Sequence, residues 1–146
     1  MLAQLETPLE TVEHLARVCA REGVPLLLDP APAIELPPEL VWQAHWFTPN
    51  ETEAAFYSGD SNGASPRETA HSLLDQGWPA VVLKLGASGV YLAERDGEDL
   101  EIPSFPVHAL DTTAAGDAFN GTFATGMMLG MTAADGARFG VAAAAV

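Results

Sequence analysis

The sequence predicts an α/β fold in which a mostly parallel sheet is covered by helices, and three observations support this prediction. Continuous apolar runs at residues 24–28 and 80–85 are typical of strands that are buried on both faces. Segments with apolar residues at helical spacing separate such runs along the chain. Neither an internal repeat nor an interdomain linker interrupts the 146 residues, so we expect a single layered domain over residues 1–146.

The first half of the chain is expected to begin with a strand and a helix. Residues 1–6 form an apolar, strand-like segment. Thr7 and Glu10 form a capping-box pattern around Pro8, which predicts a helix that Gly23 ends. Beyond the strand at 24–28, this half is expected to hold a loop with one helical turn at 30–40, a short strand at 45–48 and a helix that begins at Asn50.

The second half of the chain is expected to continue this alternation. Another helix is expected to begin at Ser65-Pro66-Arg67-Glu68 and to end at Gly77. The elements expected after it are a strand at 80–85, a glycine-rich turn at 86–89, a strand at 90–93, a hairpin turn at 95–98, a strand at 100–102 and two helices at 116–130 and 133–146.

Both ends of the chain suggest cuts through a larger fold. The chain starts abruptly in an apolar segment. Residues 140–146 predict an apolar, alanine-rich helix with no glycine, asparagine or basic residue to cap it. We therefore expect an incomplete α/β fold whose ends seek a partner surface, such as a second copy of the chain in a homodimer.

The balance of charges limits the classes of partner. The chain has 20 acidic residues against six basic ones, and its formal net charge is −14 at pH 7. Such a surface repels nucleic acid and anionic lipid, so neither is an expected partner. It also repels ATP at long range, so a nucleotide site here must rely on backbone donors and a metal ion.

Cysteine usage and hydropathy favour a cytoplasmic protein. Cys19 is the one cysteine, which excludes an internal disulfide and fits a reducing compartment. No apolar run reaches the roughly 18 residues that a membrane span needs, and the N-terminus lacks a signal-peptide pattern. The four histidines show no metal-ligand spacing, so a zinc site is not expected.

Polar or glycine-rich residues follow three of the expected strands. Asp29 follows the strand at 24–28, Asn50 and Glu53 follow the next strand, and residues 84–89 follow the third. Ligands of open α/β sheets bind beyond the carboxyl ends of the strands. We therefore expect these residues to lie together at one edge of the sheet and to form a binding site.

Asn50 and Glu53 allow two interpretations. Their spacing is that of a capping box, and the local pattern alone favours this structural role. The functional interpretation places Asn50 on a nucleotide phosphate and Glu53 on Mg²⁺, directly or through water. Both roles can hold together, because a capped helix start is also an anion site.

The segment 84–89 is compatible with a nucleotide site. Its glycines allow the backbone to approach a nucleotide closely, although a turn between two strands would produce the same residues. It is not a phosphate-binding loop of the Gly-x-x-x-x-Gly-Lys-Ser/Thr type. Lys84, the single lysine of the chain, is either a nucleotide contact or an ordinary surface charge. A dinucleotide site is not expected, since Asp29-Pro30 stands where a Gly-x-Gly-x-x-Gly motif would begin.

Residues 111–121 form the most informative segment, Asp-Thr-Thr-Ala-Ala-Gly-Asp-Ala-Phe-Asn-Gly. A stretch of small residues precedes Asp117, which opens an apolar helix. Backbone N–H groups at a helix N-terminus bind anions such as phosphate, and a neighbouring carboxylate can take the proton of an attacking hydroxyl. Alternatively, Asp117 only complements the helix dipole, but that role requires neither the residues 114–116 nor Asp111. The pattern favours a phosphoryl-transfer site.

Taken together, these segments resemble the ribokinase family of carbohydrate kinases. The resemblance rests on five segments in family order, of which the last is the most specific: 4–6, 29–33, 48–54, 85–90 and 111–121. It implies an ATP-dependent sugar kinase with a ribokinase-like α/β fold. It also implies that this chain is the C-terminal portion of such a kinase, without the N-terminal part and the small β lid.

The resemblance implies roles for the matching residues in catalysis and ATP binding. Asp117 would be the general base and would contact the sugar hydroxyl. The backbone N–H groups of Ala114, Ala115, Gly116 and Asp117 would form an anion hole for the phosphoryl group. The residues implied to contact ATP are Asn50, Lys84, Leu85, Gly86, Ala87, Ser88, Gly89, Gly116, Asp117 and Val141.

The resemblance also implies the ions and the acceptor. Glu53 would organise Mg²⁺, Asp111 and Thr113 would help to bind K⁺, and Glu6 would contact the sugar. The implied reaction converts ATP and D-ribose into ADP and D-ribose 5-phosphate. The alternatives are another acceptor of the family (fructose, a keto-deoxy sugar acid or a nucleoside) and a non-catalytic, truncated fragment that binds nucleotide or dimerises. Without a lid to exclude water, turnover by this chain alone is expected to be poor or nil.

Overall fold

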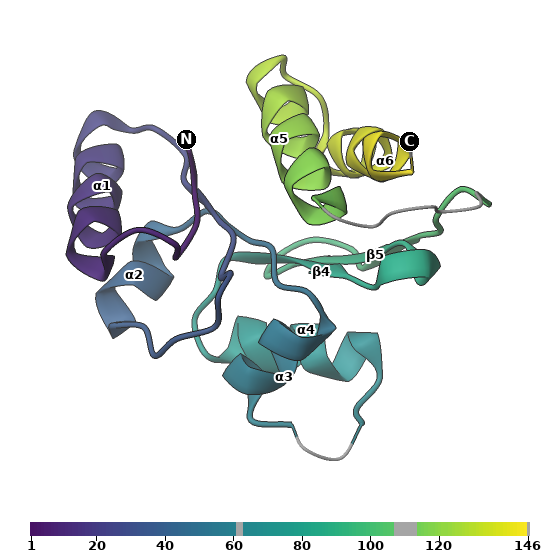
Figure 1. The fold of residues 1–146 in the computed structure, drawn as a ribbon, viewed down its shortest axis with the longest axis horizontal. Helices are drawn as coiled ribbons and strands as arrows, with labels where there is room; N and C mark the ends of the chain where they lie inside the picture. The colour runs from purple at the N-terminus through teal and green to yellow at the C-terminus, as the bar shows by residue number, and fades with distance from the viewer. Residues whose placement is uncertain (61–62, 107–113, 146) are drawn as a thin grey trace.

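The computed structural model describes residues 1–60, 63–106 and 114–145, and these form a six-stranded sheet with helices on both faces (Figure 1). The strands lie across the sheet in chain order: β1 (Leu2–Ala3), β2 (Leu27–Leu28), β3 (Trp46–Phe47), β4 (Ala80–Lys84), β5 (Val90–Glu94) and β6 (Leu100–Ile102). Strands β1 to β4 pair in parallel, whereas β4, β5 and β6 pair antiparallel. The predicted α/β class is therefore confirmed, with a mixed sheet.

The helices lie in layers against this sheet. They are α1 (Leu9–Glu22), α2 (Pro38–Gln43), α3 (Glu51–Ser58), α4 (Pro66–Asp75), α5 (Ala115–Met128) and α6 (Ala133–Ala144), with a short 3₁₀ turn η1 (Gly86–Ser88) between β4 and β5. Figure 1 shows α5 and α6 on one face of β4 and β5, with α3 and α4 on the opposite face. In the part of the chain that is described, no helix combines the length and the apolar character needed to cross a bilayer.

Strand β4 separates two apolar cores because its side chains alternate between the two faces of the sheet. Val81 and Leu83 belong to the core on the side of α1, α2 and α4. Val82 belongs to the second core, in which it packs with Phe119 and Phe123 of α5. The prediction of a strand buried on both faces is thus confirmed for β4, whose first four residues are buried.

Of the two predicted capping boxes, the one at Asn50 is present, and a further box forms at Ser65. The side chains of Asn50 and Ser65 each accept a hydrogen bond from the N3 backbone N–H, and the N3 glutamate accepts one from the cap backbone N–H. The box predicted at Thr7 is wrong, because α1 begins one residue later, with Pro8 as its N-cap and no side-chain hydrogen bond. This shift places Glu10 at the second helical position, one residue short of the register that a capping box requires.

Candidate active site

The expected strand-end residues lie together at one edge of the sheet. An isolated parallel bridge between Asn50 and Lys84 brings the segments after β3 and at the end of β4 side by side. A cleft of about 540 Å³ opens at this edge. Eight of the predicted site residues line it: Asn50, Lys84, Gly86, Ala87, Gly89, Ala115, Gly116 and Val141. Residues from the start of α3, the end of β4, α5 and α6 thus meet at one cavity of a size that ligand sites commonly have.

Asn50 and Glu53 form a closed hydrogen-bonded pair at the start of α3. The backbone N–H and the Nδ2 group of Asn50 each donate to one carboxylate oxygen of Glu53, at 2.8 Å in both cases. The backbone N–H of Glu53 donates to Oδ1 of Asn50 at 2.9 Å. Asn50 is exposed at the cleft, whereas Glu53 is buried behind it. The capping-box role of this pair is confirmed. The binding of a nucleotide phosphate by Asn50 and of Mg²⁺ by Glu53 stays a prediction.

The loop between β4 and β5 is a tight turn that depends on Gly89. The backbone N–H of Leu85 donates to the carbonyl of Gly89 at 2.8 Å, and that of Gly89 donates to the carbonyl of Gly86 at 3.1 Å. Gly89 has a φ of 96°, and a Cβ atom there would collide with the backbone of Ile102 and Ser104. Leu85 and Ser88 are not among the residues that line the cleft.

The N-terminus of α5 lies at the same cleft, which Ala115 and Gly116 line. Ala114 is the N-cap, in a left-handed conformation with a φ of 62° and without a side-chain capping bond. The backbone N–H of Ala118 donates to the carbonyl of Ala114 at 2.9 Å and closes the first helical turn. The amides of Ala115, Gly116 and Asp117 precede that bond, and amides of a first turn have no intrahelical acceptor. They form a site of positive potential beside the cleft.

Asp117 is exposed in this first turn, and its side chain is held from across the fold. Nε2 of Gln4, from the segment after β1, donates to Oδ1 of Asp117 at 2.6 Å. The predicted sugar contact Glu6 is exposed two residues further along the chain. Sequence reasoning placed Gln4 inside a family segment but gave it no role, because nothing local relates it to a residue 113 positions away.

A buried ion pair lies beneath the cleft. Nζ of Lys84 is 3.0 Å from Oδ1 of Asp29, and the side chains are 13% and 3% exposed. Nδ2 of Asn120, on α5, donates to Oδ2 of Asp29 at 2.6 Å. Burial raises the pKa of the Asp29 carboxyl above its usual value, while the attraction of Lys84 acts in the opposite direction. Lys84 is therefore not a free surface charge, and Asn120 is a site residue that the sequence did not single out.

The structure describes one of the three residues that the sequence suggested as ligands of Mg²⁺ or K⁺, namely Glu53. Asp111 and Thr113, expected to help bind K⁺, lie outside the described residues. Among the residues that are described, no group of three or more His, Cys, Asp or Glu side chains could hold a metal ion. Both oxygens of Glu53 already accept hydrogen bonds from Asn50, so contact with Mg²⁺ through a water molecule fits this residue better than direct ligation.

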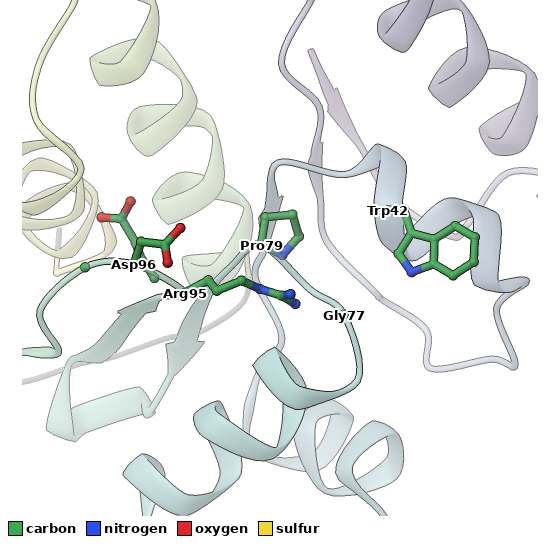
Figure 2. A pocket seen from close by; sticks show the side chains of 7 residues that line it. Trp42, Gly77, Pro79, Arg95 and Asp96 are labelled. Carbon is green, nitrogen blue, oxygen red and sulfur yellow. The ribbon is translucent and has the colours of Figure 1, made fainter.

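A second hollow, of about 470 Å³, lies at the opposite end of β4 (Figure 2). It is lined by Trp42 of α2, by residues that precede β4, and by the last residue of β5 with the turn after it: Gly77, Pro79, Glu94, Arg95, Asp96 and Gly97. Nη2 of Arg95 donates to the backbone carbonyl of Leu74 at 2.9 Å. This hollow is at the amino end of β4, away from the edge where α/β sheets bind their ligands.

Comparisons with known proteins agree with the fold. The chain is 43% identical over 148 residues to a ribokinase from Haemophilus influenzae, covering 100% of this chain and 48% of that protein. A deoxyribokinase from Salmonella typhi is 38% identical over 127 residues, covering 85% of this chain and 41% of that protein. The structure of Arabidopsis thaliana ribokinase complexed with ribose and ATP matches with a TM-score of 0.92 at 29% identity, over 99% of this chain and 47% of that one.

The chain thus spans about half the length of the curated relatives that it matches. The expectation that this half is the C-terminal one stays a prediction. The match to the pfkB family of carbohydrate kinases extends over residues 2–146. With the layered fold, the strand-end cleft and these relatives in agreement, the chain belongs to the pfkB family of carbohydrate kinases.

Proposed function

We propose that residues 1–146 form one partial domain of a sugar kinase that transfers the γ-phosphoryl group of ATP to a sugar hydroxyl. The observation that carries this proposal is the position of Asp117. Its exposed carboxylate stands in the first turn of α5, next to Gly116 and the cleft that Gly116 lines. A proton acceptor and a set of free amides are therefore adjacent, as phosphoryl transfer to a hydroxyl requires.

Asp117 is proposed to be the general base. Gln4 occupies Oδ1, so Oδ2 is the oxygen that we expect to accept the proton of the sugar hydroxyl. The amides of Ala114, Ala115, Gly116 and Asp117 are proposed to bind the oxygens of the phosphoryl group as its charge develops. Loss of one such donor typically costs about 10²–10³ in rate, so the placement of this turn decides the activity.

The cleft is proposed to hold the nucleotide. Asn50 and the segment 84–89 would face the phosphates and ribose, and Val141 of α6 would contact the adenine. Mg²⁺, held by the phosphates and through water by Glu53, would neutralise charge on the transferred group. K⁺ beside the anion hole, held with the help of Asp111 and Thr113, is a further proposal.

D-Ribose is the acceptor that we favour, because two relatives that match the whole chain, at 43% and 34% identity, are named ribokinases. Glu6 is proposed to contact it. A second candidate is deoxyribose, since two deoxyribokinases are 38% identical to this chain over 127 residues. A panel with ribose, deoxyribose, fructose, a keto-deoxy sugar acid and a nucleoside would separate these acceptors.

The substitution Asp117→Asn tests the proposed base. It keeps the size of the side chain and its bond from Gln4 but removes the proton acceptor. We expect ribose-stimulated release of ADP to fall by at least about 10³-fold while binding of Mg²⁺-ATP is retained. The measurement is ADP release with and without ribose, beside a calorimetric titration with ATP. Measurable ribose-stimulated turnover in the unmodified chain that the variant equals would refute the role of Asp117.

A further inference from the structure

The ion pair beneath the cleft contains a carboxylate that the proposed chemistry does not use. Asp29 is 2% exposed, and each of its oxygens has one partner: Lys84 on β4 and Asn120 on α5. Its side chain thus joins the end of β2 to two other elements. A buried carboxylate costs free energy through desolvation, and a buried ion pair is weak evidence for stability. A role at the neighbouring site would account for it better.

The contacts of Asn120 lead to the same conclusion. This residue is 1% exposed, and its Oδ1 atom is buried without a hydrogen-bond partner in the described structure. An orphaned buried oxygen is unfavourable, so Asn120 is poorly explained as a stabilising core residue. It stands three residues after Asp117 on α5, close to the side of the helix that bears Gly116. Its bond to Asp29 therefore ties the catalytic end of α5 to the sheet.

The ammonium of Lys84 lies between Asp29 and the start of α5. A Cβ atom placed on Gly116 would lie 3.5 Å from Nζ of Lys84, so the ammonium sits against the first turn of α5. It also lines the cleft. The same ammonium is thus in contact with Asp29 on one side and with the proposed phosphate site on the other.

We propose that Asp29 and Asn120 are positioning residues for the phosphate-binding end of the cleft, an inference that rests on the proposed kinase function. Asp29 holds the ammonium of Lys84 beside Gly116 and offsets part of its charge. Asn120 fixes the first turns of α5, and with them the free amides and Asp117, at a set distance from that ammonium.

The two residues act in opposite directions on ATP affinity, which gives a sharp test. Asp29→Asn removes the negative charge next to Lys84, so Mg²⁺-ATP should bind about three- to tenfold more tightly. Asn120→Ala keeps the ion pair but releases α5, so Mg²⁺-ATP should bind at least threefold more weakly. Adenosine, which has no phosphate, should bind all variants equally. Equal ATP affinity in the unmodified chain and both variants would overturn the proposal, as would parallel changes for adenosine.

Two variants serve as matched controls. Asp99→Asn removes one negative charge from an ion pair with His71, away from the cleft, and should leave the affinity for ATP unchanged. Thr125→Ala removes an exposed side chain of α5 whose hydroxyl donates to the backbone carbonyl of Gly121 in the same helix, and should have no effect either. If Asp29→Asn does not fold, the comparison of Asn120→Ala with Thr125→Ala still decides the outcome.

Amide hydrogen exchange separates this inference from the proposed function. The amide of Ala118, which closes the first turn of α5, should exchange at least tenfold faster in Asn120→Ala and at an unchanged rate in Thr125→Ala. An unchanged rate in Asn120→Ala would refute the positioning role whether or not ATP binds. Failure of the unmodified chain to bind Mg²⁺-ATP would instead refute the proposed function. The exchange rates would still show whether the hydrogen bond between Asn120 and Asp29 holds the first turn of α5 in place.

Discussion

At the scale of single residues, the cleft depends on side chains and glycines whose positions are set by close contacts. Gln4 reaches Asp117 from the segment after β1, and Lys84 reaches Asp29 from the end of β4. Gly89 allows the loop after β4 to pass directly beside the residues after β6. Each contact joins segments that are remote in the sequence, and each brings one group to the same edge of the sheet.

Gly89 is expected to tolerate no side chain. Alanine there would combine a φ of 96° with a collision against the backbone of Ile102 and Ser104. We expect Gly89→Ala to lower the free energy of unfolding by more than about 2 kcal/mol, measured by urea denaturation. The matched control is Gly59→Ala, which has a φ of 71° but open space around its Cβ position and should cost only about 1 kcal/mol. Equal losses for the two variants would contradict the collision.

At the scale of elements, the helix starts show which N-caps a local sequence pattern predicts correctly. The cap at Asn50 was predicted from a three-residue spacing to glutamate, and its box forms. Ser65, predicted only as a helix start, has the same spacing to Glu68 and forms a box as well. Thr7 has the same spacing to Glu10, yet α1 begins one residue later. A proline between the two residues is compatible with a helix start in either register, so the pattern alone could not distinguish them.

This difference between helix starts can be measured. Ser65→Ala should lower the free energy of unfolding by about 1 kcal/mol, because the amide of Glu68 loses its acceptor. Thr7→Ala should change it by less than about 0.5 kcal/mol, since the side chain of Thr7 caps nothing. Both values come from urea denaturation of the two variants in parallel. A loss of about 1 kcal/mol for Thr7→Ala would show that the capping box at α1 exists after all.

At the scale of the whole molecule, the sheet is attached to its helix layers by apolar packing and by polar contacts, including a cluster around Asp99. Oδ2 of Asp99, in the turn after β5, lies 2.8 Å from both Nε2 of His71 on α4 and the hydroxyl of Tyr91 on β5. The hydrogen bond from His71 is the main reason that the pKa of Asp99 is lowered. Burial, followed by the hydrogen bond to Asp99, raises the pKa of Tyr91 to about 12.

The cluster predicts a dependence of global stability on pH. A carboxyl whose pKa is lowered by folding stabilises the folded chain above its unfolded value of 3.8, and this contribution is lost as the pH falls through the folded value. Asp99→Asn should therefore be less stable than the unmodified chain at pH 6, and the difference should shrink as the pH falls below 4. Urea denaturation between pH 6 and pH 3 measures it. A difference that stays constant over this range would contradict the assigned pKa.

The sequence by itself determined the α/β class, the buried strand β4, the capping box at Asn50, the helix start at Ser65 and the strand-end location of the cleft. These features follow from patterns within a few residues, because local backbone geometry and burial impose them directly. Only the tertiary structure decided that Gln4 holds Asp117 and that Asp29 joins Lys84 to Asn120, over separations of 113, 55 and 91 residues. Such contacts depend on the order in which strands pair and on the packing of α5 against the sheet, which no local pattern specifies.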